Sequence, residues 1–409
     1  MSHPVHRLVL QADETNASLP EAGPAPAKAP PLSVYVHYPW CVRKCPYCDF
    51  NSHTQREGQD PAQLEQAYID AVIADLAAAA PGVAGRRVET VFFGGGTPSL
   101  MAPGSLARIL DALAAHTDFA ANAEVTLEAN PGTFEAGRFR DFRAAGANRL
   151  SIGIQSFNDA HLAALGRIHD GAEARRAIDI ATQHFERINL DLMYALPQQP
   201  LARAMDDVET ALAFGTEHLS CYHLTLEPNT PFHRSPPLLP DDDVAADMQE
   251  AIEARLADAG YVNYETSAFA RAGGEARHNL NYWSFGDYLG IGAGAHGKLS
   301  TPAGILREMR HKHPQRYLEA AARGEFVQEA RTVSALELPF EFMMNALRLR
   351  EGIPAPLFEE RTGLPLAVLA ERLALAREQG LLEEDGARLR ATPQGRRFLN
   401  ELLTLFIDD

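Results

Sequence analysis

Three of the four cysteines in this chain lie close together, as Cys41, Cys45 and Cys48. On a loop, the spacing C-x3-C-x2-C lets three thiolates reach three corners of one 4Fe-4S cluster, because each short gap allows the chain to curl so that every sulfur points inward. The fourth iron is then left without a protein ligand, and an iron with an open position can chelate a small molecule. The trio therefore predicts a cluster that acts as a reagent as well as an electron carrier.

The same trio has two simpler interpretations, disulfides and zinc. An odd number of neighbouring cysteines without a secretory context argues against disulfide pairing. Structural zinc needs a fourth nearby ligand, which His37 or His53 could supply, although one tight trio lacks the paired spacing of zinc ribbons. Tyr47, which lies between the second and third cysteines, fits a different purpose, since a flat side chain beside a cluster could shield it and line a nucleoside pocket.

Composition narrows the class of protein. The chain has 409 residues, of which 46% are hydrophobic, and is long enough for one large domain and a smaller one. A net charge of −17 would repel a phosphate backbone, and no Lys/Arg-rich block offsets it, so we expect no nucleic-acid partner. There is no apolar run long enough for a membrane span and no signal-peptide core. We therefore expect a cytoplasmic protein, kept reduced as an oxygen-sensitive cluster would require.

From Leu32 onward, apolar strands alternate with amphipathic helices. Repeated βα units imply a parallel sheet with helices outside it, either a partial barrel or a doubly wound sheet. We expect six strands, at 32–37, 88–93, 123–128, 149–155, 188–192 and 218–224. The helices are expected near 64–80, 106–113, 135–145, 173–185 and 201–214.

Polar residues at the ends of five strands favour the barrel. The cysteine loop follows the first strand, 94–98 (Gly-Gly-Gly-Thr-Pro) the second and 128–131 (Glu-Ala-Asn-Pro) the third, while Gln155 and Asp191 lie at or near the ends of the next two. In barrel folds the active site is assembled at the C-terminal rim, so we expect one site that faces the cluster. The expected fold class is α/β, a partial (β/α)6 TIM-like barrel with a mostly helical C-terminal domain.

The alternation of strands and helices, together with the composition, also suggests domain boundaries. Residues 1–31 contain six prolines and show no period, so we expect a disordered tail. The barrel is expected over 32–225 and an extension over 226–332, where the βα period breaks. Residues 333–409 are expected to form a winged-helix-like domain. With nine arginines, no lysine and thirteen acidic residues, this domain is expected to be a lid or a docking surface rather than a reader of DNA.

The extension contains a candidate haem motif. The segment 278–283, His-Asn-Leu-Asn-Tyr-Trp, places a histidine beside an amide and two aromatic rings in an expected loop. Histidine offers an axial nitrogen ligand, and flat rings can pack on a macrocycle, as a haem site requires. The alternative is a loop that only packs on the barrel.

The cysteine loop, with Tyr47 before its last cysteine, resembles the radical S-adenosylmethionine (SAM) superfamily, whose loop of this spacing holds a 4Fe-4S cluster. Further segments make the chain similar to the HemW-type haem chaperones, which belong to the wider family of oxygen-independent coproporphyrinogen III oxidases. The resemblance covers the chain from about Leu32 to the C-terminus. Its segments are 35–41, 94–98, 128–131, 151–157, 166–169, 190–193 and 278–283.

This resemblance implies roles for individual residues. The three cysteines would ligate the cluster, and no residue is assigned a catalytic role. Arg167 can pair with the carboxylate of SAM, while Gln155 and Asp191 can hold ribose hydroxyls. Haem binding is implied for His278, the leading candidate, with Asn279, Tyr282 and Trp283. The full set implied for SAM is Tyr35, Tyr47, Gly95, Gly96, Thr97, Glu128, Gln155, Arg167 and Asp191.

The function implied is a haem chaperone, which binds haem and passes it to an acceptor protein such as a membrane respiratory enzyme. The related oxidases carry a further cysteine two positions after the loop, where this chain has Phe50, and lack the 278–283 motif. The alternative is such an oxidase, which decarboxylates coproporphyrinogen III to protoporphyrinogen IX, so whether the protein is an enzyme stays open. Ala195 stands where relatives usually have glycine, and Cys221 is expected to be an inert core thiol.

Overall fold

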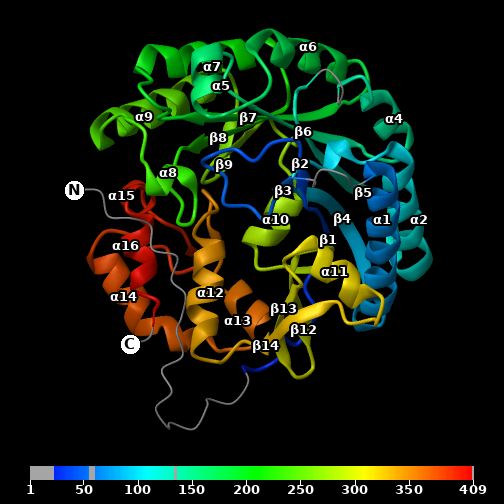
Figure 1. The fold of residues 1–409 in the computed structure, drawn as a ribbon. Coiled ribbons are helices and arrows are strands. Elements are labelled where there is room, and N and C mark those ends of the chain that lie inside the picture. Colours follow the sequence, from blue (N-terminus) through cyan, green and yellow to red (C-terminus); the bar gives the residue numbers. More distant parts are fainter. Residues whose placement is uncertain (1–22, 55–59, 133–135, 408–409) are drawn as a thin grey trace.

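The computed structural model describes residues 23–54, 60–132 and 136–407. A parallel sheet forms its centre (Figure 1). Its six strands lie in chain order, each paired with the next, as a barrel requires and a doubly wound sheet does not. This order confirms the partial (β/α)6 barrel. The strands are β1 (Leu32–Tyr38), β4 (Arg87–Gly95), β5 (Asp118–Ala129), β6 (Arg149–Gln155), β7 (Arg187–Tyr194) and β8 (His218–His223).

Helices cover the outer face of this sheet (Figure 1). The first of them begins where the sequence indicates, because Asp60 accepts a hydrogen bond from the backbone N–H of Ala62 and Pro61 occupies the first turn. Alternate strand residues such as Val34 and Val36 are buried in the main hydrophobic core. The helices are α1 (Pro61–Ala79), α2 (Pro103–His116), α4 (Phe139–Ala144), α5 (Asp159–Ala164), α6 (Gly171–Thr182), α7 (Leu201–Ala213) and α9 (Asp242–Asp258).

The segment expected as an irregular extension widens the sheet at both edges. On the β8 edge, β10 (Ala268–Ala270) and β9 (Val262–Glu265) pair antiparallel. On the other edge, β11 (Asp287–Ile291) runs parallel to β1 and is followed by three antiparallel strands. Their bounds are β12 (His296–Thr301), β13 (Gly304–Arg310) and β14 (Val327–Thr332). Since β1 pairs with β11 and β4, and β8 with β7 and β10, the barrel stays open.

The haem motif corrects one expectation. Residues 278–283 do not form a loop, because they lie in the short helix α10 (Arg277–Trp283). This helix sits against the N-terminal ends of the barrel strands, where Arg277 donates to the carbonyl of Asn122 and to Glu89. Helix α10 therefore closes the end of the barrel opposite the cysteine loop.

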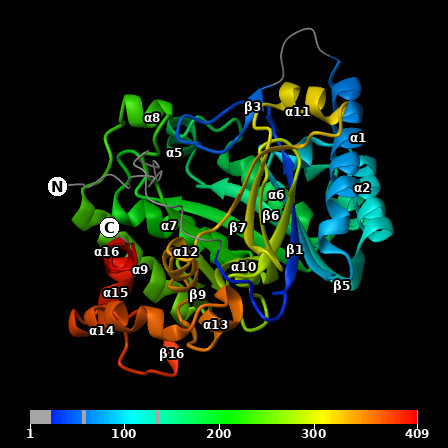
Figure 2. The same ribbon diagram turned by 90° about the horizontal axis from the view of Figure 1, so that it is seen from below.

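The C-terminal segment is mostly helical, as expected, and lies beside the barrel (Figure 2). It has a second hydrophobic core, to which Phe285 and Ile305 also contribute. Two short helices end the segment and are separated at Phe398. The domain boundaries at 225 and 332 stay predictions. The elements are α12 (Glu337–Ala346), β15 (Ile353–Pro354), α13 (Leu357–Thr362), α14 (Ala370–Glu378), β16 (Arg388–Leu389), α15 (Pro393–Arg397) and α16 (Leu399–Thr404).

The expected disordered tail needs a correction over its last part, and residues 1–22 lie outside the described residues. Gly23 is buried, and its backbone N–H donates to the carbonyl of Val333. The carbonyl of Pro30 accepts a bond of 2.7 Å from Arg86. Gly23 is thus packed against the C-terminal segment and Pro30 against the barrel, whereas residues 27–29 between them are exposed.

Candidate functional site

A cavity of about 390 Å³ runs along the inside of the barrel. Its wall includes residues from the starts of the strands, such as Arg149 and His218, and from their ends, such as Gln155 and His223. Helix α10 contributes to its floor and the cysteine loop to its mouth. Of the residues expected in the site, it is lined by Cys41, Cys45, Tyr47, Cys48, Gly95, Gly96, Thr97, Glu128, Gln155, Arg167, Asp191, His278 and Asn279.

All three loop cysteines are partly exposed to this cavity and have polar neighbours. The hydroxyl of Thr97 donates to Cys41 Sγ over 3.5 Å, and Arg167 Nη1 lies 3.9 Å from Cys45 Sγ. Burial raises the pKa of the Cys41 and Cys48 thiols, so metal must displace their protons. Iron-sulfur clusters are held by thiolates that accept hydrogen bonds, so half-buried cysteines with Thr97 and Arg167 beside their sulfurs are suitable cluster ligands.

The geometry bears on the zinc alternative. Among the residues that the structure describes, no three His, Cys, Asp or Glu side chains are grouped to hold a single metal ion. Of the two histidines considered as a fourth ligand, His37 is hydrogen-bonded at both ring nitrogens, to the hydroxyl of Tyr35 and to the carbonyl of Asn51. This leaves no ring nitrogen of His37 for zinc. His53 is hydrogen-bonded at Nε2 only, to the side-chain oxygen of Asn51.

The glycine run at the end of β4 brings bare backbone to the cavity beside Cys41. A Cβ at Gly95, whose φ is +116°, would lie 2.5 Å from the His37 ring. A Cβ at Gly96 would lie 2.6 Å from the carbonyl oxygen of Trp40. Both positions therefore require glycine, and the exposed backbone groups can approach a small ligand closely.

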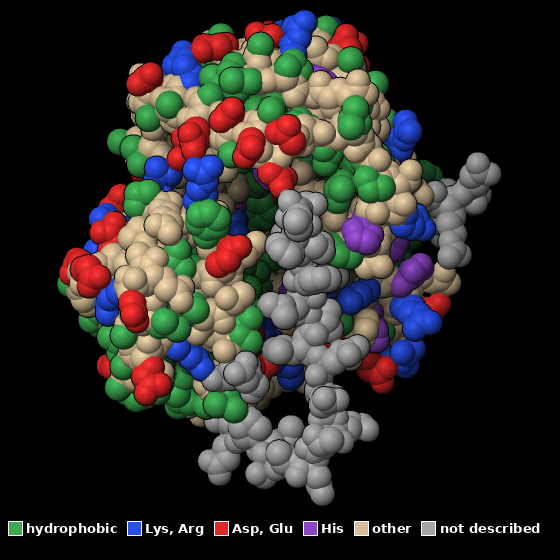
Figure 3. All heavy atoms as spheres, turned by 90° about the vertical axis from the view of Figure 1, so that its left-hand side faces the viewer, with side chains coloured by type: hydrophobic (Ala, Val, Ile, Leu, Met, Phe, Trp, Pro, Cys, Tyr) green, Lys and Arg blue, Asp and Glu red, His purple; other side chains and the backbone are tan. Residues whose placement is uncertain are grey.

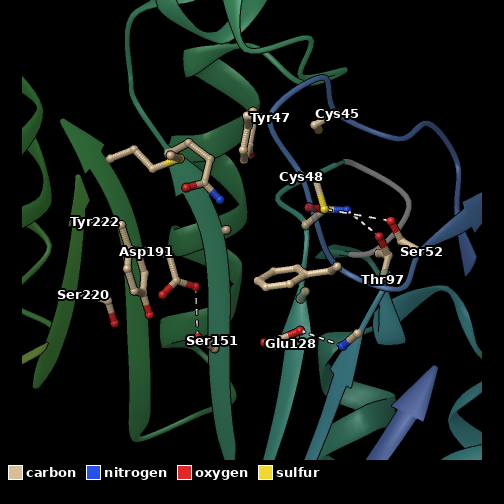
Figure 4. A pocket seen from close by; sticks show the side chains of 18 of the residues that line it. Cys45, Tyr47, Cys48, Ser52, Thr97, Glu128, Ser151, Asp191, Ser220 and Tyr222 are labelled. Carbon is tan, nitrogen blue, oxygen red and sulfur yellow. Dashed lines mark hydrogen bonds between the residues drawn. The ribbon is translucent and has the colours of Figure 1, made fainter. Parts of the chain in front are cut away.

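Two half-buried carboxyls line the cavity, Glu128 on β5 and Asp191 on β7, with Ser151 of β6 between them (Figure 4). Burial, and then the charge of Asp191, raise the pKa of Glu128 to about 8. Asp191 accepts hydrogen bonds from Ser151 Oγ at 3.0 Å and from Asn189 Nδ2 at 2.8 Å, and burial raises its pKa as well. Such oxygens suit the hydroxyls and positive groups of a nucleoside ligand.

Arg167 provides the complementary positive charge near the cluster loop. Its Nη2 donates to Asn130 Oδ1 at 2.6 Å and to the carbonyl of Gly153 at 2.7 Å. Its buried Nε has no hydrogen-bond partner within the described residues, so it can still bind an anionic group. Next to it, Gln155 has a φ of +67°, a strained conformation for a non-glycine residue that turns the chain at the cavity wall.

The floor of the cavity is a buried ionic network around Glu124. This fully buried carboxylate accepts bonds from His278 Nδ1 and Arg187 Nη1, both at 2.9 Å. Burial alone would raise the pKa of Glu124, but His278 and the neighbouring arginines hold it far below its usual range. Because Nδ1 of His278 donates to Glu124, its Nε2 carries the lone pair on the cavity side.

Sequence reasoning missed several residues of the wall. They occupy alternate positions of the strands and share an inward direction, while the residues between them are buried in the core. Polar residues at every second position of otherwise apolar strands were the available signal. The missed wall residues are Asn130, Arg149, Ser151, Asn189, His218 and Ser220. Glu124, also missed, lies buried beneath the wall and bonds His278.

Three expected residues do not line the cavity. Tyr35 lies behind Phe92, on which its ring stacks at 6.1 Å, and it donates to His37. Tyr282 stacks on Tyr288 at 4.4 Å, and the Trp283 ring packs on the guanidinium of Arg348 at 4.3 Å. The structure therefore separates Tyr282 and Trp283 from His278 and Asn279, which face the cavity.

Known proteins resemble the chain along nearly its whole length. The model of the radical SAM superfamily matches residues 35–211, and that of the HemN C-terminal domain matches 333–398. A Haemophilus influenzae protein named heme chaperone HemW is 47% identical, covering 93% of this chain and 99% of that protein. The Escherichia coli protein of the same name is 47% identical over the same shares.

A solved structure supports the fold. The coproporphyrinogen III oxidase HemN from Escherichia coli, described as a radical SAM enzyme, superimposes with a TM-score of 0.77 at 24% identity, over 92% of this chain and 90% of that one. At this identity the likeness concerns the arrangement of the elements. Separately, none of the helices in the described ranges is long and apolar enough to cross a membrane.

Proposed function

Because this chain belongs to the HemW family of the radical SAM superfamily, we propose that it is a haem chaperone that binds haem and passes it to an acceptor protein. We further propose that it carries a 4Fe-4S cluster and SAM, and that it works in the cytoplasm. The observation that carries the proposal is that the three loop cysteines and all the residues implied for SAM except Tyr35 line one cavity. Phe50, in place of the oxidases' further cysteine, also favours the chaperone over the oxidase.

In this proposal, Cys41, Cys45 and Cys48 are the three protein ligands of the cluster. When bound, the cluster supplies redox chemistry to SAM at its fourth iron. The chain's own residues would orient SAM: Arg167 would hold its carboxylate, and the backbone at 94–96 would contact its methionine part. Glycine is required at 95 and 96 because a Cβ there would collide with the His37 ring and the Trp40 carbonyl, so only backbone groups border the cavity at these positions.

The opposite wall would hold the nucleoside part of SAM. Asp191 and Gln155, which line the cavity, would accept from the ribose hydroxyls, and Glu128 would face a positive group. Tyr47 would shield the cluster side, since it lines the cavity between Cys45 and Cys48. For haem, the motif residues His278, Asn279, Tyr282 and Trp283 stay candidates, although they do not face one cavity.

The test begins with anaerobic reconstitution of the full chain, followed by assays of iron, sulfide and bound haem. We expect about four irons and four sulfides per chain, a change in the cluster spectrum on addition of SAM, and stoichiometric haem uptake. Cys45→Ser should lose the cluster. Cys221→Ser is the matched control, because Cys221 is buried in a strand away from the loop.

Two further assays distinguish a haem chaperone from a coproporphyrinogen III oxidase. Haem-loaded protein should restore the activity of a haem-depleted acceptor, and an anaerobic assay with coproporphyrinogen III should yield no protoporphyrinogen. Zinc in place of iron and sulfide would contradict the cluster. Protoporphyrinogen formation without haem uptake would support the oxidase instead.

A further inference from the structure

A buried arginine at the floor of the barrel cavity lacks a partner. Arg149 is the first residue of β6, and its side chain lines the cavity although the residue is only 2% exposed. Among the described residues, its Nε has no hydrogen-bond partner, and its guanidinium forms no other hydrogen bond or ion pair with them. A buried charge without hydrogen bonds is costly, so such a group in a cavity wall indicates a ligand that completes it. The proposed binding of SAM and haem does not use Arg149.

The buried carboxylate of the floor, Glu124, does not pair with Arg149. Its Oε1 accepts hydrogen bonds from Nδ1 and from the backbone N–H of His278, at 2.9 and 3.2 Å. Its Oε2 accepts from the Arg187 guanidinium at 2.9 Å and from the backbone N–H of Arg277 at 3.2 Å. With two donors on each oxygen, this carboxylate is fully hydrogen-bonded without Arg149. The Arg149 guanidinium therefore keeps its donors for another group.

Two further polar residues near Arg149 do not satisfy it either. Thr126 pairs with Arg149 in the register of β5 and β6 and is fully buried, and its hydroxyl also has no partner in the part of the chain that the structure describes. His218 is hydrogen-bonded at both ring nitrogens, to Asn189 at 2.7 Å and to Tyr264 at 2.8 Å. Adjacent strands thus carry two buried polar groups that await a partner.

Arg149 lies deeper in the barrel than the strand residues implied for SAM. In the register of the sheet, Glu128 lies level with Ser151, one inward-facing position above Arg149. Asp191 lies level with Gly153, two such positions above it. Each inward-facing position adds about 7 Å, because a strand rises by about 3.3 Å per residue. A SAM molecule held between these carboxyls and the cysteine loop leaves the Arg149 guanidinium for a second ligand.

The groups at the floor define the chemistry of that ligand. The planar guanidinium of Arg149 matches the two oxygens of a carboxylate. Two other groups there are acceptors, His278 Nε2 and the Oδ1 of Asn279, whose Nδ2 donates to Tyr264 at 3.1 Å. One cation among acceptors suits a single carboxylate with neighbouring O–H or N–H groups better than a phosphate, which needs more donors. Since the cavity of about 390 Å³ also holds SAM in the proposed function, the acid must be small.

The outside of the molecule does not attract anions. The net charge of the chain is −17. Figure 3 shows Asp and Glu side chains along the upper edge of the hollow in one face. Because these charges repel a carboxylate, its affinity has to come from a positive group inside the barrel.

We propose that the floor of the barrel is a binding site for a small carboxylic acid, with Arg149 as the residue that pairs with its carboxylate. Hydroxyl or N–H groups of the acid face His278 Nε2 and Asn279 Oδ1. The proposal goes beyond the haem-chaperone function, because binding of the acid requires no haem. A haem propionate carries the same chemical group, so the experiment has to separate these two sources of a carboxylate.

The test is titration of the full-length, anaerobically reconstituted protein with sodium acetate, with saturating SAM present so that Arg167 is occupied. A ligand of the folded protein raises the midpoint of urea denaturation. We expect acetate to raise it saturably in the wild type and acetamide, its neutral isostere, to leave it unchanged. Arg149→Gln should increase the Kd for acetate at least ~10-fold, because the charged partner is lost. Arg175→Gln is the control and should match the wild type, since Arg175 packs on Phe157 outside the cavity.

The outcomes identify the source of the carboxylate. No saturable effect of acetate on the wild type, or equal Kd values in the wild type and Arg149→Gln, overturns the proposal. Haemin should bind equally well to both. If Arg149→Gln weakens the binding of haemin but not of haemin dimethyl ester, Arg149 binds a propionate and the small acid is wrong. If the wild type binds acetate but no haemin, the chaperone function fails and the acid site stands.

A measurement on the wild type covers the case in which Arg149→Gln does not fold, as judged by circular dichroism. A crystal structure of the wild type, grown with SAM and with acetate well above its Kd, then decides. Acetate with an oxygen within hydrogen-bond distance of the Arg149 guanidinium supports the proposal. Acetate bound only elsewhere overturns it.

Discussion

His278 Nδ1 and Glu124 Oε1 lie 2.9 Å apart at the bottom of the barrel, so the motif histidine is joined to a strand of the barrel rather than to the protein surface. The same carboxylate also accepts from the backbone N–H groups of Arg277 and His278, both at 3.2 Å. One buried charge thus satisfies the first turn of α10 and orients the histidine. The position of α10 depends on Glu124.

Glu124→Gln tests this dependence. Removing one member of a buried ionic network leaves the others without a partner, and we expect a loss of ~2 to 4 kcal/mol in the free energy of unfolding at pH 7. The pKa of Glu124 in the folded protein lies below its unfolded value. Its contribution is therefore present above the unfolded value and is lost as the pH falls toward the folded one, so the variant should lose less stability in acid. Urea denaturation at several pH values measures both.

Glu89→Gln is the matched control, because Glu89 also bonds an α10 residue, Arg277, at 2.8 Å but is partly exposed. A solvated ion pair of this kind contributes about 0 to 1 kcal/mol. Equal losses for the two variants would mean that burial at Glu124 does not matter.

Glu128 should give a pH dependence of the opposite sign. The pKa of its carboxyl is raised to about 8 by burial and by Asp191, from an ordinary value of about 4.5. The folded protein thus holds this proton more tightly, and the stabilisation is complete below the unfolded pKa and is lost as the pH rises to 8. We expect Glu128→Gln to remove this decline and to be ~2 to 4 kcal/mol more stable than the wild type at pH 9, without SAM. Denaturation between pH 5 and 9 checks it.

The same carboxyl should couple SAM binding to proton release. SAM carries a positive sulfonium and ammonium, which favour the ionised form of a carboxyl facing them. Near pH 7 we expect binding to release up to one proton from Glu128, and the affinity to rise with pH until about 8. Calorimetry in two buffers of different ionisation enthalpy measures the protons released. Glu128→Gln should release fewer, and an unchanged count would place the proton elsewhere.

The sequence predicted the barrel well, because each strand has apolar residues on its core-facing side and ends at glycine, proline or polar residues. It did not reveal that the 226–332 segment supplies strands to both edges, since pairing across such distances leaves no local period. It also misjudged the motif at 278–283. Its alternation of polar and aromatic residues is typical of a loop, whereas the helix is held by Glu124, a residue 154 positions away in the chain.

Arg167 should control SAM affinity without controlling the cluster. Its guanidinium donates to Asn130 and Gly153 through Nη2 and leaves Nε for the ligand. A lysine ammonium cannot reproduce this planar arrangement of donors. We expect Arg167→Lys to raise the Kd for SAM by ~10- to 100-fold, since a charged pair contributes ~1.5 to 3 kcal/mol. Iron and sulfide content should not change.

Arg175→Lys is the comparison for that variant. Arg175 packs over the Phe157 ring at 5.0 Å and does not line the cavity. In Arg175→Lys, the Kd for SAM, measured from the change in the cluster spectrum, should equal that of the wild type. A loss of iron in Arg167→Lys would show that the contact with Cys45 Sγ supports the cluster itself.

Ala195, directly after β7, has a φ of +56°, a conformation that suits glycine better than alanine. A left-handed alanine is strained by ~1 to 2 kcal/mol, whereas glycine is not. Ala195→Gly should therefore change the free energy of unfolding by less than ~1 kcal/mol, because relief of strain offsets the lost methyl group and the greater entropy of the unfolded chain.

Ala204 in α7 is equally buried, at 2% exposure, but helical. Ala204→Gly should cost ~1 to 2 kcal/mol, since the same losses occur there without any relief of strain. Equal costs for the two substitutions, measured by urea denaturation, would mean that position 195 is not strained.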